Sequence, residues 1–190
     1  ITNYNYGKYI ARCVRSCIAQ KYISAEIIVV DDASTDNSIE MLQPWLADIK
    51  LIKLPENKGV AYSSNVGLGA ARSPFVVRVD SDDWVANNMC YFIKEFLENN
   101  HTAFGVALDY IICDEYENVI ERKSAKDFPI SCAIGYRRDL LLAVGGYNAA
   151  LRHREEEELR ARLGVLYKLD YLNMALYRYR RHDSNKTLSE

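Results

Sequence analysis

The sequence predicts an α/β fold in which a mostly parallel central sheet carries helices on both faces. Residues 1–100 alternate β-branched apolar runs with helical segments, in the order strand, helix, strand, helix, strand. Such alternation is typical of parallel strands joined by right-handed crossovers. Residues 101–190 contain more closely spaced, tyrosine-rich strand patterns, which favour antiparallel additions to that sheet.

The elements of the first half follow from periodicity and from turn residues. Segment 8–22 carries one apolar stripe opposite its Lys and Arg residues, so it predicts an amphipathic helix. "DDASTDNS" breaks a strand and offers capping residues to a helix that Pro44 ends or kinks. The expected strands are EIIVV (26–30), KLIKL (50–54) and FVVRV (75–79), and a helix rich in small residues is expected at 60–72.

The second half begins with a clear amphipathic helix at 86–98. Two strands, 103–114 and 119–124, are expected on either side of the turn EYEN. Short helices are expected at 137–144 and 155–163, and two closing strands at 167–172 and 174–182. We expect one domain over 1–190, with a nucleotide-sugar-binding half (1–100) and an acceptor-side half (101–190). Because the chain starts at Ile1 inside an apolar-to-turn transition, we expect a fragment that lacks the first residues of a strand.

Composition excludes several classes of function. The 190 residues are 49% hydrophobic and 26% charged, with a formal net charge of −2, as in ordinary soluble domains. No basic excess indicates a nucleic-acid partner, and no apolar stretch approaches the ~18 residues that span a bilayer. The five cysteines include no CxxC, so buried reduced thiols and a cytosolic location are expected.

Two acidic clusters each follow an expected strand: Asp31-Asp32, and the DSDD run that contains Asp80, Asp82 and Asp83. In open α/β sheets, ligands bind at the carboxyl ends of strands, so both clusters should share one edge. Residues i and i+2 of an extended chain point to the same side, so Asp80 and Asp82 can converge on one ion. Mg²⁺ or Mn²⁺, bridged to ligand phosphates, suits such carboxylates, whereas the alternative is a solvated acidic turn.

Other motif assignments fit less well. "DASTDNSIE" resembles a calcium loop but lacks the central Gly, and Gln43 stands where the bidentate Glu belongs. "GLGAAR" lacks the third Gly of a dinucleotide fingerprint and lies inside a helix. "DSDDW" loosely fits the haloacid dehalogenase type of phosphatase, but that motif belongs after the first strand and Trp84 replaces its small residue.

Taken together, segments along nearly the whole chain resemble a family 2 glycosyltransferase with the GT-A, Rossmann-like fold. These segments are TNYNYGKYIARCVRSCIAQKY, EIIVVDDASTDNS, ENKGVAYSSNVGLGAARSPFVVRVDSDDW, VGGYNAAL with the following EEEEL, and YRYRRHDSNKT. The resemblance implies that Thr2 and Tyr4 lie beside the base and ribose of the donor nucleotide. It also implies that Asp32 hydrogen-bonds a uracil-type base on a ligand edge, where its loss would spare the fold.

The same resemblance assigns the acidic loop. Asp80 points towards the ribose or the metal, Asp82 is the direct metal ligand and Asp83 orients the loop. Asn65 buttresses that loop rather than touching the donor.

The acceptor side departs from the family pattern. The family usually has Glu-Asp where this chain has Glu155-Glu156, so Glu156 stands in the place of the catalytic base. The register within four glutamates stays open by one residue, and a solvated helix face is the alternative. His182 matches a His near the donor diphosphate; its alternative is a surface histidine at a strand end.

The resemblance therefore implies an inverting, metal-dependent glycosyltransferase of the hexosyltransferase type, active in polysaccharide or glycoconjugate synthesis. The donor would be a nucleotide-diphosphate sugar, expected to be a UDP-sugar, with Mn²⁺ or Mg²⁺ as cofactor. The acceptor would be a glycan or lipid-linked glycan, met in the cytoplasm or peripherally at the inner face of the membrane. The alternative is a non-catalytic glycosyltransferase-like domain that binds a nucleotide sugar or a partner.

Overall fold

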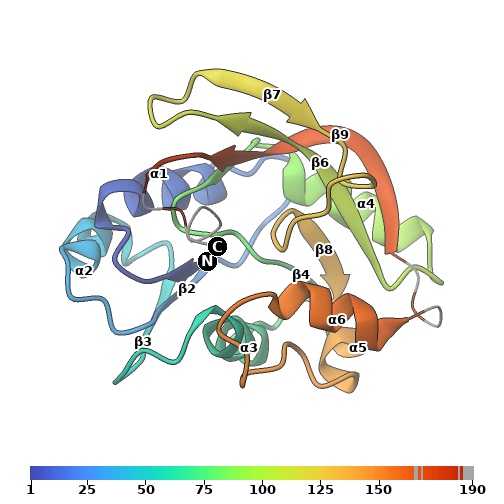
Figure 1. The fold of residues 1–190 in the computed structure, drawn as a ribbon, viewed down its shortest axis with the longest axis horizontal. Helices are drawn as coiled ribbons and strands as arrows, with labels where there is room; N and C mark the ends of the chain where they lie inside the picture. The colour runs from blue at the N-terminus through green and yellow to red at the C-terminus, as the bar shows by residue number, and fades with distance from the viewer. Residues whose placement is uncertain (165–166, 168, 184, 186–190) are drawn as a thin grey trace.

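Two β-sheets form the centre of the chain in a computed structural model that describes residues 1–164, 167, 169–183 and 185 (Figure 1). The first sheet has three strands in the order β1-β2-β3, and all its pairs are parallel. The second is a six-stranded mixed sheet. The α/β class predicted from the sequence is confirmed, with a wholly parallel sheet in the N-terminal half.

The parallel sheet consists of β1 (Thr2–Asn3), β2 (Ile28–Asp31) and β3 (Lys50–Lys53). On one face, Val29 packs in a cluster with α1 (Gly7–Ile18) and α2 (Ser38–Leu42). On the other face, Val30 lies against Gly67 of α3 (Val60–Ala70). Helices thus cover both faces, as predicted. Pro44 lies in a short 3-10 helix, η1 (Gln43–Trp45), which follows α2 directly.

The mixed sheet runs in the order β4-β8-β6-β9-β5, with β7 paired to β6. Its pairs are antiparallel except for β6 with β9, which are parallel. The closing segment forms one 12-residue strand, β9, instead of the two strands expected. The bounds are β4 (Phe75–Val77), β5 (Trp84–Val85), β6 (Gly105–Cys113), β7 (Val119–Lys123), β8 (Ile134–Arg137) and β9 (Leu169–Arg180).

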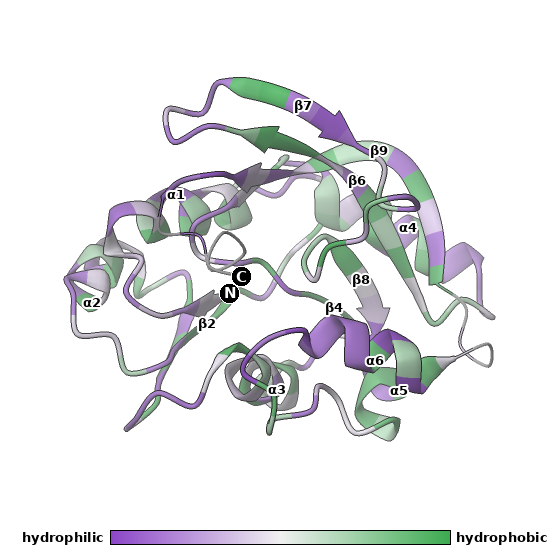
Figure 2. Ribbon diagram, in the orientation of Figure 1, coloured by the Kyte–Doolittle hydropathy of each residue, from purple (hydrophilic) through white to green (hydrophobic). Residues whose placement is uncertain are grey.

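The remaining helices cover the mixed sheet on its two faces. Alternate β6 residues divide between two apolar clusters: Val106 and Leu108 pack with α4 (Met89–Asn99), whereas Ala107 packs with α5 (Arg138–Ala143) and α6 (Glu155–Leu163). Figure 2 shows β8 changing from apolar at its start to hydrophilic at its end, near the strongly hydrophilic first turn of α6. Among the described residues, no helix combines the length and the apolar character needed to cross a bilayer.

Within the described part of the chain, one isolated bridge connects β1 to the segment that follows β4. Thr2 pairs in parallel with Asp80, and its backbone N–H donates to the Val79 carbonyl at 3.3 Å. The ends of β1 and β2 and the segment after β4 therefore meet at one edge. This meeting brings the two acidic clusters together, as the sequence predicts.

The packing of α4 on β8 gives a first prediction, on stability. A Cβ at Gly135 would lie 2.2 Å from Ile93 Cγ2 of α4, so Gly135→Ala should lower the free energy of unfolding by about 1–3 kcal/mol. Gly69→Ala is the matched control, because Gly69 lies inside α3 and a Cβ added there would meet nothing within 4 Å; it should raise stability by about 0.5–1 kcal/mol. Urea unfolding of both variants checks this, and a Gly135→Ala variant as stable as Gly69→Ala would contradict the packing.

Candidate active site

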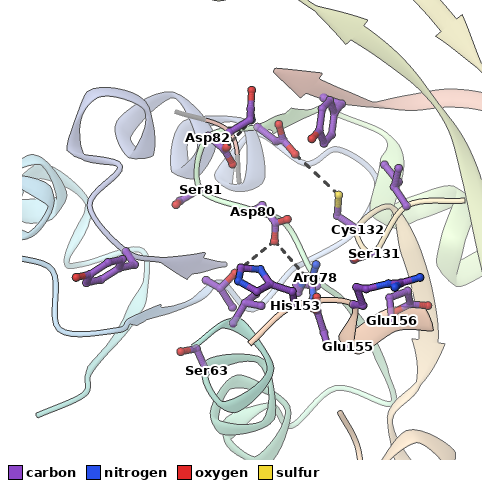
Figure 3. A pocket seen from close by; sticks show the side chains of 18 of the residues that line it. Ser63, Arg78, Asp80, Ser81, Asp82, Ser131, Cys132, His153, Glu155 and Glu156 are labelled. Carbon is purple, nitrogen blue, oxygen red and sulfur yellow. Dashed lines mark hydrogen bonds and ion pairs between the residues drawn. The ribbon is translucent and has the colours of Figure 1, made fainter. Parts of the chain in front are cut away.

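A cavity of about 330 Å³ opens where the strand ends meet (Figure 3). Acidic side chains dominate one wall, and residues 152–157 with Arg160 form the opposite wall. Among the residues predicted from the sequence, those that line this cavity are Thr2, Tyr4, Asp32, Asp80, Asp82, Asp83 and Glu156. His182 lies behind the acidic wall, in contact with Asp82.

Asp80 is the most accessible carboxylate of the acidic loop, with its side chain 30% exposed. Its Oδ1 accepts a hydrogen bond from Thr2 Oγ1 at 3.3 Å and lies 3.1 Å from Arg78 Nε. The backbone bridge to Thr2 fixes the same residue from β1. Asp80 is thus held at the cavity surface by two neighbours, with part of its carboxylate open to a ligand.

Asp83 is buried, with 2% of the residue exposed, although it also contributes to the lining of the cavity. Its carboxylate accepts hydrogen bonds from the Tyr177 hydroxyl at 2.6 Å and from the Arg180 backbone N–H at 2.7 Å. Burial, with Asp82 and Asp80 beside it, raises the pKa of Asp83 well above its usual range. These contacts anchor the loop to β9, which agrees with the orienting role predicted for Asp83.

Asp82 points towards the C-terminal segment. Its Oδ2 lies 3.2 Å from His182 Nε2 and 3.3 Å from Asn185 Nδ2. The His182 ring also packs against Tyr9, with ring centroids 4.7 Å apart. His182 is therefore buried, and the alternative of a surface histidine is wrong. Of the closing segment YRYRRHDSNKT, Ser184, Lys186 and Thr187 lie outside the described residues.

The donor chemistry of this wall fits a hard divalent cation. Asp80, Asp83 and Cys132 place ligand atoms within 4.8 Å of one another. However, burial raises the pKa of the Cys132 thiol well above its usual range, and a protonated thiol is a poor ligand for Mg²⁺ or Mn²⁺. Asp83 is occupied by Tyr177 and Arg180. The carboxylates suited to such a cation are those of Asp80 and Asp82, which both line the cavity.

Asp32 serves the fold as well as the cavity. Its Oδ1 accepts the backbone N–H of Lys58 at 2.8 Å, and its Oδ2 accepts that of Gly59 at 2.7 Å. Gly59, with a positive φ of 92°, precedes the first residue of α3. The carboxylate therefore fixes the loop that starts α3, so we expect its loss to weaken the fold as well as to change the ligand edge. Each oxygen retains a lone pair for a ligand.

The four glutamates of α6 differ in their partners. Glu155 pairs with Arg78 at 2.8 Å, Glu157 with Arg154 at 2.6 Å and Glu158 with Arg162 at 2.9 Å. Within the described part of the chain, Glu156 has no such ion pair. Its Oε1 accepts a hydrogen bond from the Tyr136 hydroxyl at 2.8 Å, and its Oε2 has no hydrogen-bond partner there.

Burial changes the pKa of Glu156. The residue is 2% exposed, and desolvation raises the pKa of Glu156 to about 7. When the pKa of a carboxyl group lies near the working pH, its ionised form is present to accept a proton and its protonated form is also accessible. The four glutamates therefore do not form one solvated helix face. Glu155 and Glu156 are buried, whereas Glu157 is exposed.

Two residues that were missed or misplaced from the sequence complete the site. Arg78 lies within an apolar strand pattern, two positions before Asp80, so strand alternation could have placed both on one side. Asn65 is structural, as predicted, but it supports a different segment: its side chain bonds the backbone N–H and carbonyl of Tyr147, at 2.9 and 2.7 Å. The spacing of 82 residues between these two gives no signal in the sequence.

The sequence profile of glycosyl transferase family 2 matches residues 1–155. The chain belongs to this family. It is 35% identical, over 121 residues, to an uncharacterized glycosyltransferase of Haemophilus influenzae, in a match that covers 62% of this chain and 48% of that one. It is 25% identical over 205 residues to the hyaluronan synthase of Pasteurella multocida, covering 100% of this chain and 21% of the synthase. The chain thus spans less than half the length of these relatives.

Solved structures share the fold of this family 2 chain. S. aureus TarS residues 1–349, in complex with UDP-GlcNAc, superposes with a TM-score of 0.84 at 21% identity, covering 100% of this chain and 59% of that one. The mannosyltransferase PcManGT of Pyrobaculum calidifontis, in complex with GDP-Man and Mn²⁺, gives 0.77 at 19% identity, covering 99% and 57%. At these identities the likeness shows the fold alone, and it confirms the predicted GT-A fold.

The contacts of Asp32 give a second prediction. Asp32→Asn exchanges one acceptor oxygen for an NH₂ group that faces a backbone N–H, so one of the two amides loses its partner. The free energy of unfolding should fall by about 1–3 kcal/mol. The exposed Asp48→Asn is the matched control and should stay within about 0.5 kcal/mol of wild type. Denaturant unfolding measures both, and an Asp32→Asn variant of wild-type stability would refute the anchoring role.

Proposed function

We propose that the chain is the catalytic domain of an inverting, metal-dependent glycosyltransferase that uses a nucleotide-diphosphate sugar. The observation that carries this proposal is the placement of Glu156, a buried carboxylate with a pKa near 7, in the same cavity as the Asp80–Asp83 loop. A base on one wall and acidic cation ligands on the other are what an in-line sugar transfer needs.

On the donor side, Thr2, Tyr4 and Asp32 would receive the nucleoside, and Asp80 and Asp82 would hold Mn²⁺ or Mg²⁺ against the diphosphate. When bound, the cation supplies positive charge to the leaving diphosphate. His182 is buried against Asp82, so in this scheme it would act on the same phosphates through that carboxylate. TarS binds UDP-GlcNAc and PcManGT binds GDP-Man with Mn²⁺ in the same fold. Of these, the uracil role of Asp32 favours a UDP-sugar here.

On the acceptor side, Glu156 would remove the proton from the acceptor hydroxyl. The acceptor oxygen then bonds to C1 of the sugar while the bond from C1 to the diphosphate oxygen breaks on the opposite face, with inversion. The proton ends on Glu156, and the electron pair leaves with the nucleotide diphosphate. In this scheme residues 1–100 supply the donor contacts and residues 101–190 supply the base, within one domain.

The acceptor that we propose is a glycan or a lipid-linked glycan. The similarity to a hyaluronan synthase supports a role in polysaccharide or glycoconjugate synthesis. A lipid-linked acceptor would place the domain in the cytoplasm at the inner face of the membrane. The alternative, a domain that binds a nucleotide sugar without catalysis, would release no nucleotide diphosphate from the donor, whereas an active transferase hydrolyses some donor in the presence of metal.

The third prediction concerns the cation. UDP should bind more weakly after chelation of Mn²⁺ by EDTA, by about tenfold or more, because a bridging ion worth about 1.4 kcal/mol changes affinity tenfold. Asp82→Asn should abolish the difference between the two conditions, whereas the exposed Asp48→Asn should preserve it. Isothermal titration calorimetry makes the measurement. Equal affinity of the wild-type chain with and without metal would contradict the metal assignment.

The fourth prediction concerns the base. Glu156→Gln preserves shape but cannot take a proton, so sugar transfer should fall by about 10²–10⁴-fold while UDP affinity changes little. Because the base must be ionised, wild-type kcat/KM should rise with pH through about 7, following the pKa of Glu156. The Glu156→Gln variant should not show this rise. Transfer is measured by nucleotide release, after wild-type protein has been screened with several UDP-sugars and glycan acceptors.

Glu157→Gln is the matched control, one position along α6 but exposed and paired with Arg154. It should retain wild-type transfer and the wild-type pH profile. A loss of transfer in Glu157→Gln, with Glu156→Gln unaffected, would show that the base lies one residue further along the helix.

A further inference from the structure

Arg78 carries a buried charge between the two walls of the cavity. The residue directly follows β4, and its side chain is 8% exposed. A guanidinium stays charged in a protein, so its burial is costly unless carboxylates and hydrogen bonds compensate for the lost water. The partners of Arg78 therefore indicate which parts of the cavity this buried charge connects.

The partners come from opposite walls. Arg78 Nε lies 3.1 Å from Asp80 Oδ1 of the acidic loop, and its NH1 donates to Glu155 Oε1 at 2.8 Å, a residue 77 positions away in the chain. Figure 3 shows Arg78 between these two carboxylates. The contact with Glu155 is a hydrogen bond, whereas the contact with Asp80 is an ion pair without hydrogen-bond geometry. The planar guanidinium presents separate nitrogen atoms to the two carboxylates, which the single ammonium of a lysine does not.

A third contact fixes the arginine itself. The ring of Tyr147 lies 5.6 Å from the guanidinium carbon, at cation–π distance. Tyr147 is in turn tied to α3 by both hydrogen bonds of Asn65. Glu155 is the first residue of α6 and the neighbour of Glu156. The contacts thus connect α3, the acidic loop and the turn that carries the base.

We propose that Arg78 is a positioning residue that, through Glu155, holds Glu156 at a fixed spacing from the Asp80–Asp83 loop. The proposal rests on the function proposed above, because it assigns a purpose to that spacing: the acceptor hydroxyl must meet the donor sugar with its base in reach. Displacement of a reacting group by about 1 Å can cost about 10²-fold in rate.

The bridge also has an electrostatic consequence for Glu156. The groups that act on it are the Tyr136 hydroxyl from β8, Arg78 after β4, and Arg160 and Glu155 on α6, with Tyr147 nearby. The positive charge of Arg78 lowers the pKa of Glu156, and the negative charge of Glu155 raises it. Removing the two partners of one ion pair should therefore move this pKa in opposite directions.

The kinetic test is a double-mutant cycle of Arg78→Met and Glu155→Gln. Each single variant should lose about 10–100-fold in kcat, and the double variant should lose no more than Arg78→Met alone, because the two residues act through one bridge. Arg78→Lys keeps the positive charge but lacks the planar guanidinium that contacts both carboxylates, so kcat should also fall. The exposed pair Arg72 and Glu26, 2.9 Å apart, is the control, and Arg72→Met with Glu26→Gln should leave kcat unchanged.

A second measurement needs neither acceptor nor turnover. NMR titration of the ¹³C-labelled glutamate carboxyl groups should show the pKa of Glu156 raised in Arg78→Met, lowered in Glu155→Gln and near wild type in Arg78→Lys. Glu155→Gln preserves side-chain shape, so it tests the bridge even where Arg78→Met does not fold. If neither variant shifts this pKa, or if folded variants keep wild-type kcat, the proposal is overturned.

These outcomes separate the two claims. A wild-type chain that transfers no sugar from any donor refutes the proposed function, while the titration still decides whether Arg78 and Glu155 act on Glu156. A wild-type chain that is active, with variants that lose only stability and not kcat, retains the proposed function and refutes the positioning role.

Discussion

The crowding of carboxylates around one cavity is the constraint on which the rest of this structure depends. Like charges at such distances raise one another's pKa and weaken the fold unless each finds compensation. The carboxylates here are compensated by partners from several parts of the chain, and Arg78 serves two of them. Asp32 is compensated by two backbone amides, Asp80 by Arg78 and Thr2, Asp82 by His182 and Asn185, Asp83 by Tyr177 and the Arg180 amide, and Glu155 by Arg78.

These compensating contacts explain why the acidic loop depends on distant parts of the chain. Tyr177 and Arg180 lie on β9, so the acidic loop depends on a strand formed almost 100 residues later, and the parallel pairing of β6 with β9 sets its register. Glu156 is the exception, because its Oε2 has no hydrogen-bond partner among the described residues and burial raises its pKa to about 7. Functional sites often contain one titratable group whose burial is not fully compensated by hydrogen bonds or charges. Such a group has a shifted pKa and is reactive, at a cost to the stability of the fold.

Much of this arrangement is local enough to be predicted from the sequence. Strand periodicity places Asp32 and Asp80 at strand ends, and topology brings strand ends to one edge. Other features depend on tertiary contacts that leave no local signal. The two closing strand patterns merge into β9 because β6 offers one long edge, and the second role of Asp32 depends on where α3 begins. Which of the four glutamates turn inward also depends on tertiary contacts, such as that of Glu156 with Tyr136.

A crystal structure of the chain with UDP and Mn²⁺ tests the metal and donor assignment most directly. We expect the cation on the carboxylates of Asp82 and Asp80 and bound to the diphosphate, the uracil beside Asp32, and Glu156 across the cavity with its carboxylate directed to the open space beyond the diphosphate. A cation held by Asp83 and Cys132, or a nucleotide bound outside this cavity, would contradict it.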